Sequence, residues 1–121
     1  MASVQIINVN NPSLNILAQK CSSFVCQLKG LMFRKSLGQN EGLLFIENHD
    51  DRLGSSIHML FMNFDITVVW INSAKQVVDV KLARKWSLVH VPKEPAKFIL
   101  ELHSSKYSEF SIGDILEFNY Q

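Results

Sequence analysis

Two titratable side chains lie in apolar surroundings that could give them a chemical role, His58 and Glu101. A histidine inside an apolar strand could bind a ligand or carry a proton. The alternative for His58 is a buried imidazole that is hydrogen-bonded to the backbone. Glu101 alternates with Leu100 and Leu102, so its carboxyl group either faces solvent or is buried and needs a polar partner. A cleft that contained both groups would permit acid–base chemistry.

Three further residues complete the candidate ligand-binding set: Glu41, Asp114 and Met62. The two acids could join Glu101 in a carboxylate cluster able to do acid–base work. The alternative for Asp114 is a tight turn, since Gly113 before it can adopt the positive φ that such turns need. Met62 could line a pocket, but it lies among other methionines and phenylalanines, for which core packing is the ordinary explanation.

No catalytic residue, metal-ligand set or cofactor motif follows from the sequence. The other histidines, His49, His90 and His103, lie in separate segments, whereas a zinc site needs three or four converging ligands. The chain has no phosphate-binding glycine loop and no serine-nucleophile elbow. We therefore expect no cofactor and no native metal.

The two cysteines, Cys21 and Cys26, are too few for a disulfide framework in a chain of this length. On one helix they would lie about 140° apart around the axis, so we expect no bridge between them. Free thiols fit a reducing compartment, and residues 1–5 lack the basic and apolar regions of a secretory signal. These observations predict a cytoplasmic location.

Composition limits the class of protein. Apolar residues make up 47% and charged residues 19% of the 121 residues, which is an ordinary globular balance and favours one domain over residues 1–121. The net charge is +1 and no long basic or membrane-length apolar run occurs, so we expect neither nucleic acid nor membrane among the partners. The densest basic segment, at 81–85, is interpreted as a solvated strand end, with an anion-binding patch as the alternative.

Short β-prone segments separated by turns dominate the chain. The expected strands lie at 4–9, 15–20, 43–47, 56–62, 66–72, 76–83, 86–91, 96–102 and 115–120. The continuous apolar run that starts at Ile66 suggests a strand covered on both faces. One short helix is expected near residues 22–34, with Ser22 or Ser23 as its N-cap. Phe24, Leu28 and Leu31 have the spacing of a buried helical stripe. The pattern favours a mostly β fold, as a β-sandwich or a partly open barrel.

Four segments, in order and at matching spacing, resemble one known family. They are residues 28–34 (LKGLMFR), 41–45 (EGLLF), 56–71 (beginning SIHMLFMNF and ending VVWI) and 98–114 (beginning FILEL and ending IGD). These four segments resemble those of the domain of unknown function 192 family, also called uncharacterised protein family 0127. The resemblance implies a jelly-roll-like β-sandwich with one short helix, and it implies no activity. Some relatives carry secretion signals.

The chain departs from the family pattern beside the third segment. The family usually has proline, an apolar residue and aspartate where this chain has Asp65, Ile66 and Thr67. Asn63 stands where the family frequently has arginine. If that aspartate and arginine serve a site in the family, this chain has lost or rearranged it.

Three classes of function remain open at this stage. The first is a small non-catalytic ligand-binding or accessory module, which the absence of a catalytic signature favours. The second is an enzyme of unknown reaction that uses His58 and Glu101 in one cleft. The third is a structural protein that forms homo-oligomers through exposed aromatic residues such as Trp86, Tyr107 or Phe110.

Overall fold

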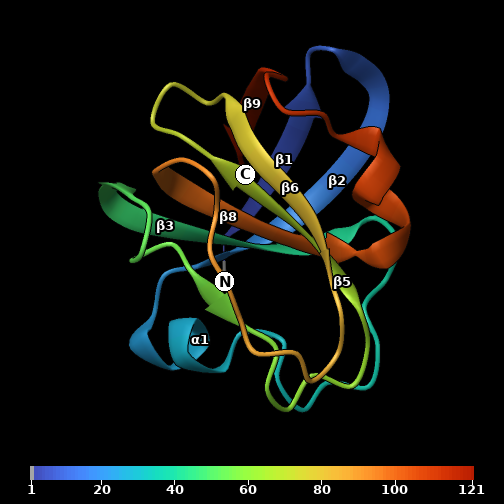
Figure 1. Cartoon of the computed structure of the whole chain (residues 1–121). Helices are drawn as coiled ribbons and strands as arrows, with labels where there is room; N and C mark the ends of the chain where they lie inside the picture. Colours follow the sequence, from blue (N-terminus) through green and yellow to red (C-terminus); the bar gives the residue numbers. More distant parts are fainter. Residues whose placement is uncertain (1) are drawn as a thin grey trace.

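The computed structural model describes residues 2–121, without the side chains of Phe24 and Val25. Most of the elements are strands, and two short helices interrupt them (Figure 1). They are β1 (Ser3–Asn8), β2 (Asn11–Cys21), α1 (Phe24–Lys29), β3 (Glu41–Asp51), β4 (Ile57–His58), β5 (Ile66–Ile71), β6 (Val77–Ala83), β7 (Val89–His90), β8 (Ala96–His103), the 3-10 helix η1 (Ser104–Glu109) and β9 (Leu116–Tyr120). The predicted mostly β class with a short helix near the front is confirmed.

Seven of the strands form one mixed sheet in the order β6-β5-β8-β3-β2-β1-β9, and β4 pairs with β7 in a second, two-stranded sheet. The large sheet curls until its edge strands β6 and β9 approach each other (Figure 1). There Gln76 forms an isolated bridge with Ile115. The Val77 amide donates to the Asp114 carbonyl oxygen at 2.8 Å. The result is a partly open barrel, with one parallel pair, β2 and β3, that the sequence did not predict.

Both faces of the central strands are buried. One cluster fills the inside of the curled sheet and includes Leu44, Val69 and Leu100. A second cluster covers the outer face and includes Leu31, Met59 and Trp70. All six residues of β5 are buried, which confirms the prediction made from its continuous apolar run. Because β3, β5 and β8 contribute to both clusters, the described residues form one domain.

Helix α1 is shorter than predicted and lies against the outer face. Ser23 is its N-cap, as predicted, and its hydroxyl oxygen accepts a hydrogen bond from the Cys26 amide at 3.1 Å. Gly30 ends the helix with φ +53°, a conformation that glycine adopts without strain. The predicted buried stripe is only partly right, since Leu31 is buried but Leu28 is 64% exposed. The side chain of Phe24 lies outside the described residues.

The expectation that the cysteines stay unpaired is wrong. Cys21 and Cys26 form a disulfide with their Cα atoms 5.6 Å apart, within the usual range for such a bridge. The helical geometry used to argue against it does not apply, because α1 begins at Phe24 and Cys21 is the last residue of β2. The chain turns between the two residues, and the bridge ties the start of α1 to the end of the strand.

The predicted strand at 56–62 is also mostly wrong. Only Ile57 and His58 are extended, and the chain then turns so that the Met62 amide donates to the Met59 carbonyl oxygen at 3.2 Å. The turn lets Met59 and Met62 both point into the outer cluster. Among residues 2–121, no helix has the length and apolar character of a membrane span.

Candidate functional site

A cavity of about 280 Å³ lies between α1 and the outer face of the sheet. Its walls come from four parts of the chain: α1 with the residues after it, β3, the β3–β4 connection with β4 and Met62, and β8. The lining residues are Gln27, Leu28, Lys29, Gly30, Leu31, Met32, Phe45, Glu47, Gly54, Ser56, Ile57, His58, Met62, Ile99 and Glu101. Seven of these residues have apolar side chains and six have polar or charged ones, and the polar ones determine what the cavity can bind.

Glu101 is the buried acid of this cavity. It lies on β8 with its side chain on the outer face, beside Ile99, and it is 7% exposed. Its Oε1 lies 3.7 Å from the position that a Cβ on Gly30 would occupy. Burial raises the pKa of Glu101 to about 7. No described residue donates a hydrogen bond to this carboxyl group or forms an ion pair with it.

A close approach of two strands fixes the position of Glu101. Gly42 of β3 lies opposite Leu102 of β8. A Cβ on Gly42 would lie 2.9 Å from the Glu101 carbonyl oxygen and 2.6 Å from Leu102 Cδ2. Glycine at this position therefore lets β8 pack against β3 without displacing the backbone that carries the carboxyl group.

His58 lines the same cavity from β4. Its Nδ1 accepts a hydrogen bond from the Leu60 backbone amide at 3.2 Å. Because Nδ1 is the acceptor, the neutral imidazole carries its proton on Nε2. His58 therefore offers an N–H donor to a bound molecule. The alternative for His58 was a buried imidazole that is hydrogen-bonded to the backbone. The hydrogen bond is present, but the residue is exposed.

Two further charged residues stand at the cavity, Glu47 of β3 and Lys29 of α1. Burial and the nearby Asp51 carboxylate raise the pKa of Glu47, and His49 opposes that change. Two acids and one lysine thus lie at the cavity. Once both acids are ionised, the cavity favours a bound cation over a bound anion.

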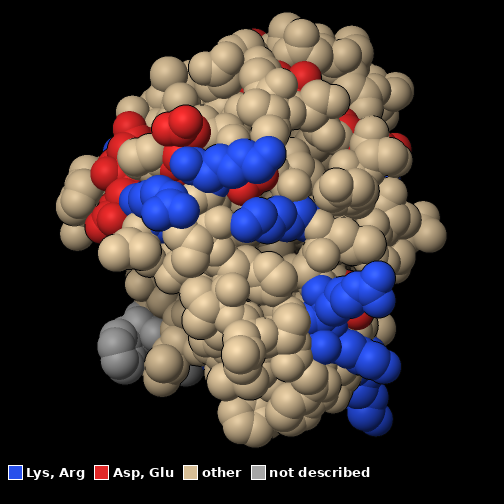
Figure 2. All heavy atoms as spheres, in the orientation of Figure 1, with Lys and Arg blue, Asp and Glu red and all other residues tan. Residues whose placement is uncertain are grey.

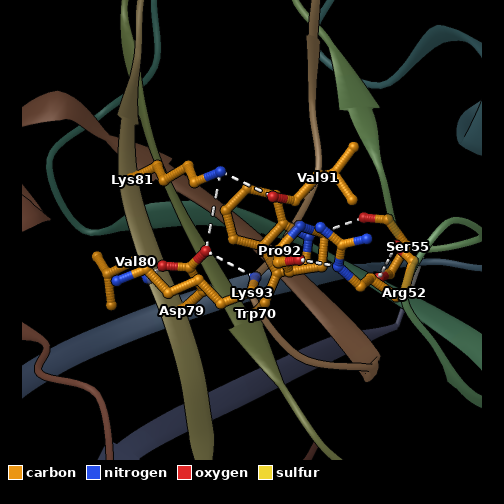
Figure 3. Close-up of polar contacts among 9 residues, drawn as sticks. All are labelled: Arg52, Ser55, Trp70, Asp79, Val80, Lys81, Val91, Pro92 and Lys93. Atoms are coloured by element: carbon orange, nitrogen blue, oxygen red, sulfur yellow. Dashed lines mark hydrogen bonds and ion pairs between the residues drawn. The ribbon is translucent and has the colours of Figure 1, made fainter.

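Buried hydrogen bonds hold the wall that carries Gly54 and Ser56. The Trp70 Nε1–H donates to the Ser55 carbonyl oxygen at 2.7 Å (Figure 3). The Ser55 hydroxyl donates to the Asp51 carbonyl oxygen at 2.6 Å. Trp70 is fully buried on β5. The rigid sheet therefore fixes the loop from which two cavity residues come.

A second set of contacts supports β4 and His58. The Lys81 ammonium group donates to the Val91 carbonyl oxygen at 2.7 Å and lies 3.8 Å from the buried Asp79 carboxylate. That carboxylate also accepts the Lys93 amide at 3.0 Å (Figure 3). The segment held in this way directly follows β7, and β7 pairs with β4 so that His58 lies opposite Val89. These contacts make the cavity wall a preformed structure.

Only three of the five predicted site residues meet. His58, Met62 and Glu101 line the cavity. Glu41 is exposed and accepts the Gly38 amide at 3.1 Å. Asp114 accepts the Asn8 side-chain amide at 2.9 Å and the Ser111 amide at 2.8 Å, as expected of a residue that stabilises a turn. The carboxylate cluster of Glu41, Asp114 and Glu101 therefore does not form.

Sequence reasoning missed Glu47 and Lys29. Glu47 had a usable signal, because it is two residues beyond Phe45 in one strand and so faces the same side. Lys29 had none, since its place at the cavity depends on how α1 packs. Within residues 2–121, no group of three His, Cys, Asp or Glu side chains is arranged to hold a metal ion.

Sequence comparison extends the similarity over nearly the whole chain. The model of the DUF192 family, described as "Uncharacterized ACR", matches residues 6–118. The chain belongs to the DUF192 family. A UPF0127 protein of Pyrococcus furiosus is 36% identical over 108 residues, which cover 88% of this chain and 90% of that protein. The resemblance read from the four sequence segments is confirmed, and the DUF192 family is itself uncharacterised.

Other relatives are longer. UPF0127 proteins of Thermococcus gammatolerans and Thermococcus kodakarensis are 40% and 42% identical over 79 residues, or 65% of this chain. These residues are 50% and 48% of those proteins, so the chain matches about half the length of these DUF192 relatives.

Two crystal structures share the fold. A Sinorhizobium meliloti protein with the provisional name of a transcription regulator has a TM-score of 0.82 at 21% identity, covering 97% of this chain and 92% of that one. A Novosphingobium aromaticivorans protein of unknown function has a TM-score of 0.80 at 20% identity, covering 95% of this chain and 83% of that one. At such identities the likeness shows the fold alone.

The departures from the DUF192 pattern at Asn63 and Thr67, like the one at Asp65, lie outside the cavity. The Asn63 side-chain amide donates to the Arg34 carbonyl oxygen at 3.0 Å. The Thr67 hydroxyl donates to the Ser104 carbonyl oxygen at 3.1 Å. Neither residue lines the cavity. Asn63 joins two loops, and Thr67 joins β5 to the start of η1. The cavity is intact despite these replacements.

Proposed function

We propose that this DUF192 chain is a non-catalytic module that binds a small molecule in the cavity between α1 and the sheet. The ligand would carry a protonated amine on a compact apolar body. The observation that carries the proposal is Glu101, whose side chain is only 7% exposed, opens onto the cavity and has no hydrogen-bond or ion-pair partner among the described residues. A carboxyl group so little exposed normally has a polar partner, and here a ligand in the cavity would supply it.

The proposed ligand chemistry follows from the charges around the cavity. An ionised Glu101 is penalised by burial, and a cation beside it would remove much of that penalty. Glu47 adds a second acid at the same cavity. The apolar side chains, such as Leu31 and Ile99, would cover the body of the ligand. The Nε2–H of His58 would donate to an oxygen of the ligand, where it has one.

The test compares three probes of similar shape: benzylamine, benzyl alcohol and benzoate. Binding is followed by amide NMR shifts and by calorimetry. Because ionised Glu101 supplies most of the attraction for the amine, the affinity should rise by up to about tenfold per pH unit below the pKa of Glu101 and then level off. Benzyl alcohol should bind weakly with no such rise, and benzoate should not bind.

The matched variants are Glu101→Gln and Glu41→Gln, which make the same chemical change inside and outside the cavity. Glu101→Gln should abolish the pH dependence and most of the affinity for benzylamine, whereas Glu41→Gln should leave both unchanged. Preferential binding of benzoate, equal binding of all three probes, or shifts confined to residues away from the cavity would each contradict the proposal.

A second candidate is an enzyme that uses Glu101 and His58 for acid–base chemistry. Its support is that both residues line one cavity and that the pKa of Glu101, about 7, lies where proton transfer is efficient. Turnover of a small ester or amide that both His58→Ala and Glu101→Gln abolish would favour this candidate over the binding module.

The cytoplasmic location stays a prediction, and the disulfide between Cys21 and Cys26 argues against it. Disulfides persist mainly in oxidising compartments. Cell fractionation combined with thiol labelling would decide the matter: a bridged protein outside the cytoplasm would overturn the prediction, and reduced thiols in the cytoplasm would support it.

A further inference from the structure

Three exposed aromatic side chains form a cluster at one end of the molecule, called here the aromatic knob: Phe33, Phe61 and Trp86. The rings of Phe33 and Phe61 stack with their centroids 5.1 Å apart. Trp86 meets Phe61 edge to face at 5.3 Å. The three residues are 63%, 45% and 52% exposed, respectively. They come from three separate loops, so the fold assembles this apolar surface from distant parts of the chain.

The backbone of the knob is strained. Four non-glycine residues among residues 2–121 have positive φ, and three of them are Phe33 (66°), Phe61 (61°) and Trp86 (63°). A left-handed conformation is unfavourable for a residue with a Cβ, because the Cβ approaches the following carbonyl oxygen. Hydrogen bonds maintain it: the Phe33 amide donates to the Phe61 carbonyl oxygen, and the Trp86 amide donates to the Met59 carbonyl oxygen, each at 3.0 Å.

Burial of the rings does not compensate for this backbone strain, because all three rings remain about half exposed. Backbone strain concentrates where a structure must present a side chain for function. Apolar exposure continues along the same loops through Leu60, Leu88 and Val89. The cavity between α1 and the sheet is not lined by Phe33, Phe61 or Trp86, so the knob is separate from the candidate site.

Basic residues flank the knob, in a group called here the basic rim: Arg34, Lys35, Arg84 and Lys85. All four are exposed. The nearby acid, Asp65, accepts the Lys85 backbone amide at 2.9 Å. Figure 2 shows basic side chains gathered at the lower right, beside a broad surface without charge at the end where the loops meet in Figure 1.

We propose that the aromatic knob and the basic rim together dock this protein on the surface of an anionic lipid bilayer. Tryptophan and other aromatic rings favour the level of the lipid headgroups. The aliphatic side chains Leu60, Leu88 and Val89 would enter the acyl boundary, and the rim would attract the anionic headgroups. This proposal revises the expectation that no membrane is a partner, and it does not depend on the cavity.

Other occupants fit the surface less well. A second copy of the chain would bring two basic rims together across a two-fold axis, with like charges opposed. Single-stranded nucleic acid stacks its bases on free ring faces, and the stacking of Phe33 on Phe61 already occupies one face of each ring. The exposed aliphatic residues would also gain nothing from bases. A lipid surface uses the aromatic, aliphatic and basic parts together.

The experiment is vesicle flotation, with phosphatidylcholine alone and mixed with phosphatidylserine, at low and physiological salt. The wild-type chain should float with the mixed vesicles and less so as salt rises. Its tryptophan emission should shift to the blue through Trp86, because Trp70 is already buried. Arg84→Gln with Lys85→Gln should weaken binding about thirtyfold, the equivalent of about 1 kcal/mol for each cation removed.

Trp86→Asn separates docking from folding, because asparagine tolerates the left-handed backbone. We expect this variant to fold with unchanged stability, to lose most of its vesicle binding and to show no emission shift. The matched controls, Ile112→Ser and Lys93→Gln, change exposed residues outside the knob and rim and should bind as the wild type does.

Failure of the wild-type chain to float with any vesicle would overturn the proposal. So would tight binding of a single-stranded oligonucleotide that Trp86→Asn abolishes while vesicles stay unbound, or a dimer in sedimentation that the same substitution disrupts.

Discussion

Replacing Glu101 by Gln gives the clearest energetic test of the buried acid. Burial raises the pKa of this carboxyl group from 4.5 to about 7 in the folded protein, whereas the unfolded chain keeps the ordinary value. Between these pH values the folded state holds a proton that the unfolded state has released. The wild-type free energy of unfolding therefore falls as the pH rises through this window and levels off above it.

The size of this effect follows from the change in pKa. A difference of about 2.5 units corresponds to about 3 kcal/mol, at 1.36 kcal/mol per unit. Glutamine cannot ionise and so avoids this loss. The stability of Glu101→Gln relative to the wild type should therefore rise by about 3 kcal/mol between about pH 4.5 and about pH 7, and stay constant above.

Urea unfolding of both proteins at a series of pH values measures the difference, since the titration of all other groups cancels. Glu41→Gln is the control and should show a difference that does not vary with pH. A flat difference for Glu101→Gln as well would refute the reasoning. It would mean that water in the cavity hydrates the ionised Glu101 as well as bulk solvent does.

Two further variants test the surroundings of the cavity. Trp70→Phe leaves the Ser55 carbonyl oxygen unpaired, so we expect a loss of roughly 1–3 kcal/mol by urea unfolding followed by circular dichroism; unchanged stability would show that this hydrogen bond does not hold the cavity wall. Cys21→Ser removes the bridge to Cys26 and should cost about 2 kcal/mol for so short a loop, and dithiothreitol should lower the wild-type midpoint similarly and leave the variant unaffected. A wild-type midpoint insensitive to dithiothreitol would contradict the bridge.

The sequence predicted the parts of the fold that depend on local pattern. The apolar run of β5 reports burial on both faces directly, and Ser23 identifies the start of α1 because its hydroxyl caps the helix. Pairings between distant segments gave no such signal. The parallel contact of β2 with β3 depends on the path of the chain through α1. The error over Cys21 came from treating it as a helical residue, although it is the last residue of β2.

The candidate site was predicted as separate residues and not as an arrangement. The alternation around Glu101 left two outcomes, solvent or burial, because sequence does not show that α1 covers the outer face of β8. The same limit applies to Asp114, whose turn contacts appear only once β9 lies beside β1. Glu47 was within reach, since it shares a strand face with Phe45.

A carbon-13 NMR titration of the Glu101 carboxyl group, without and with benzylamine, tests the central claim most directly. The claim is that Glu101, a buried acid without a partner among the described residues, binds a cationic ligand. We expect a pKa of about 7 without the amine and a clearly lower pKa when the amine is bound. An ordinary carboxyl pKa in the free protein, or one that benzylamine does not change, would contradict it.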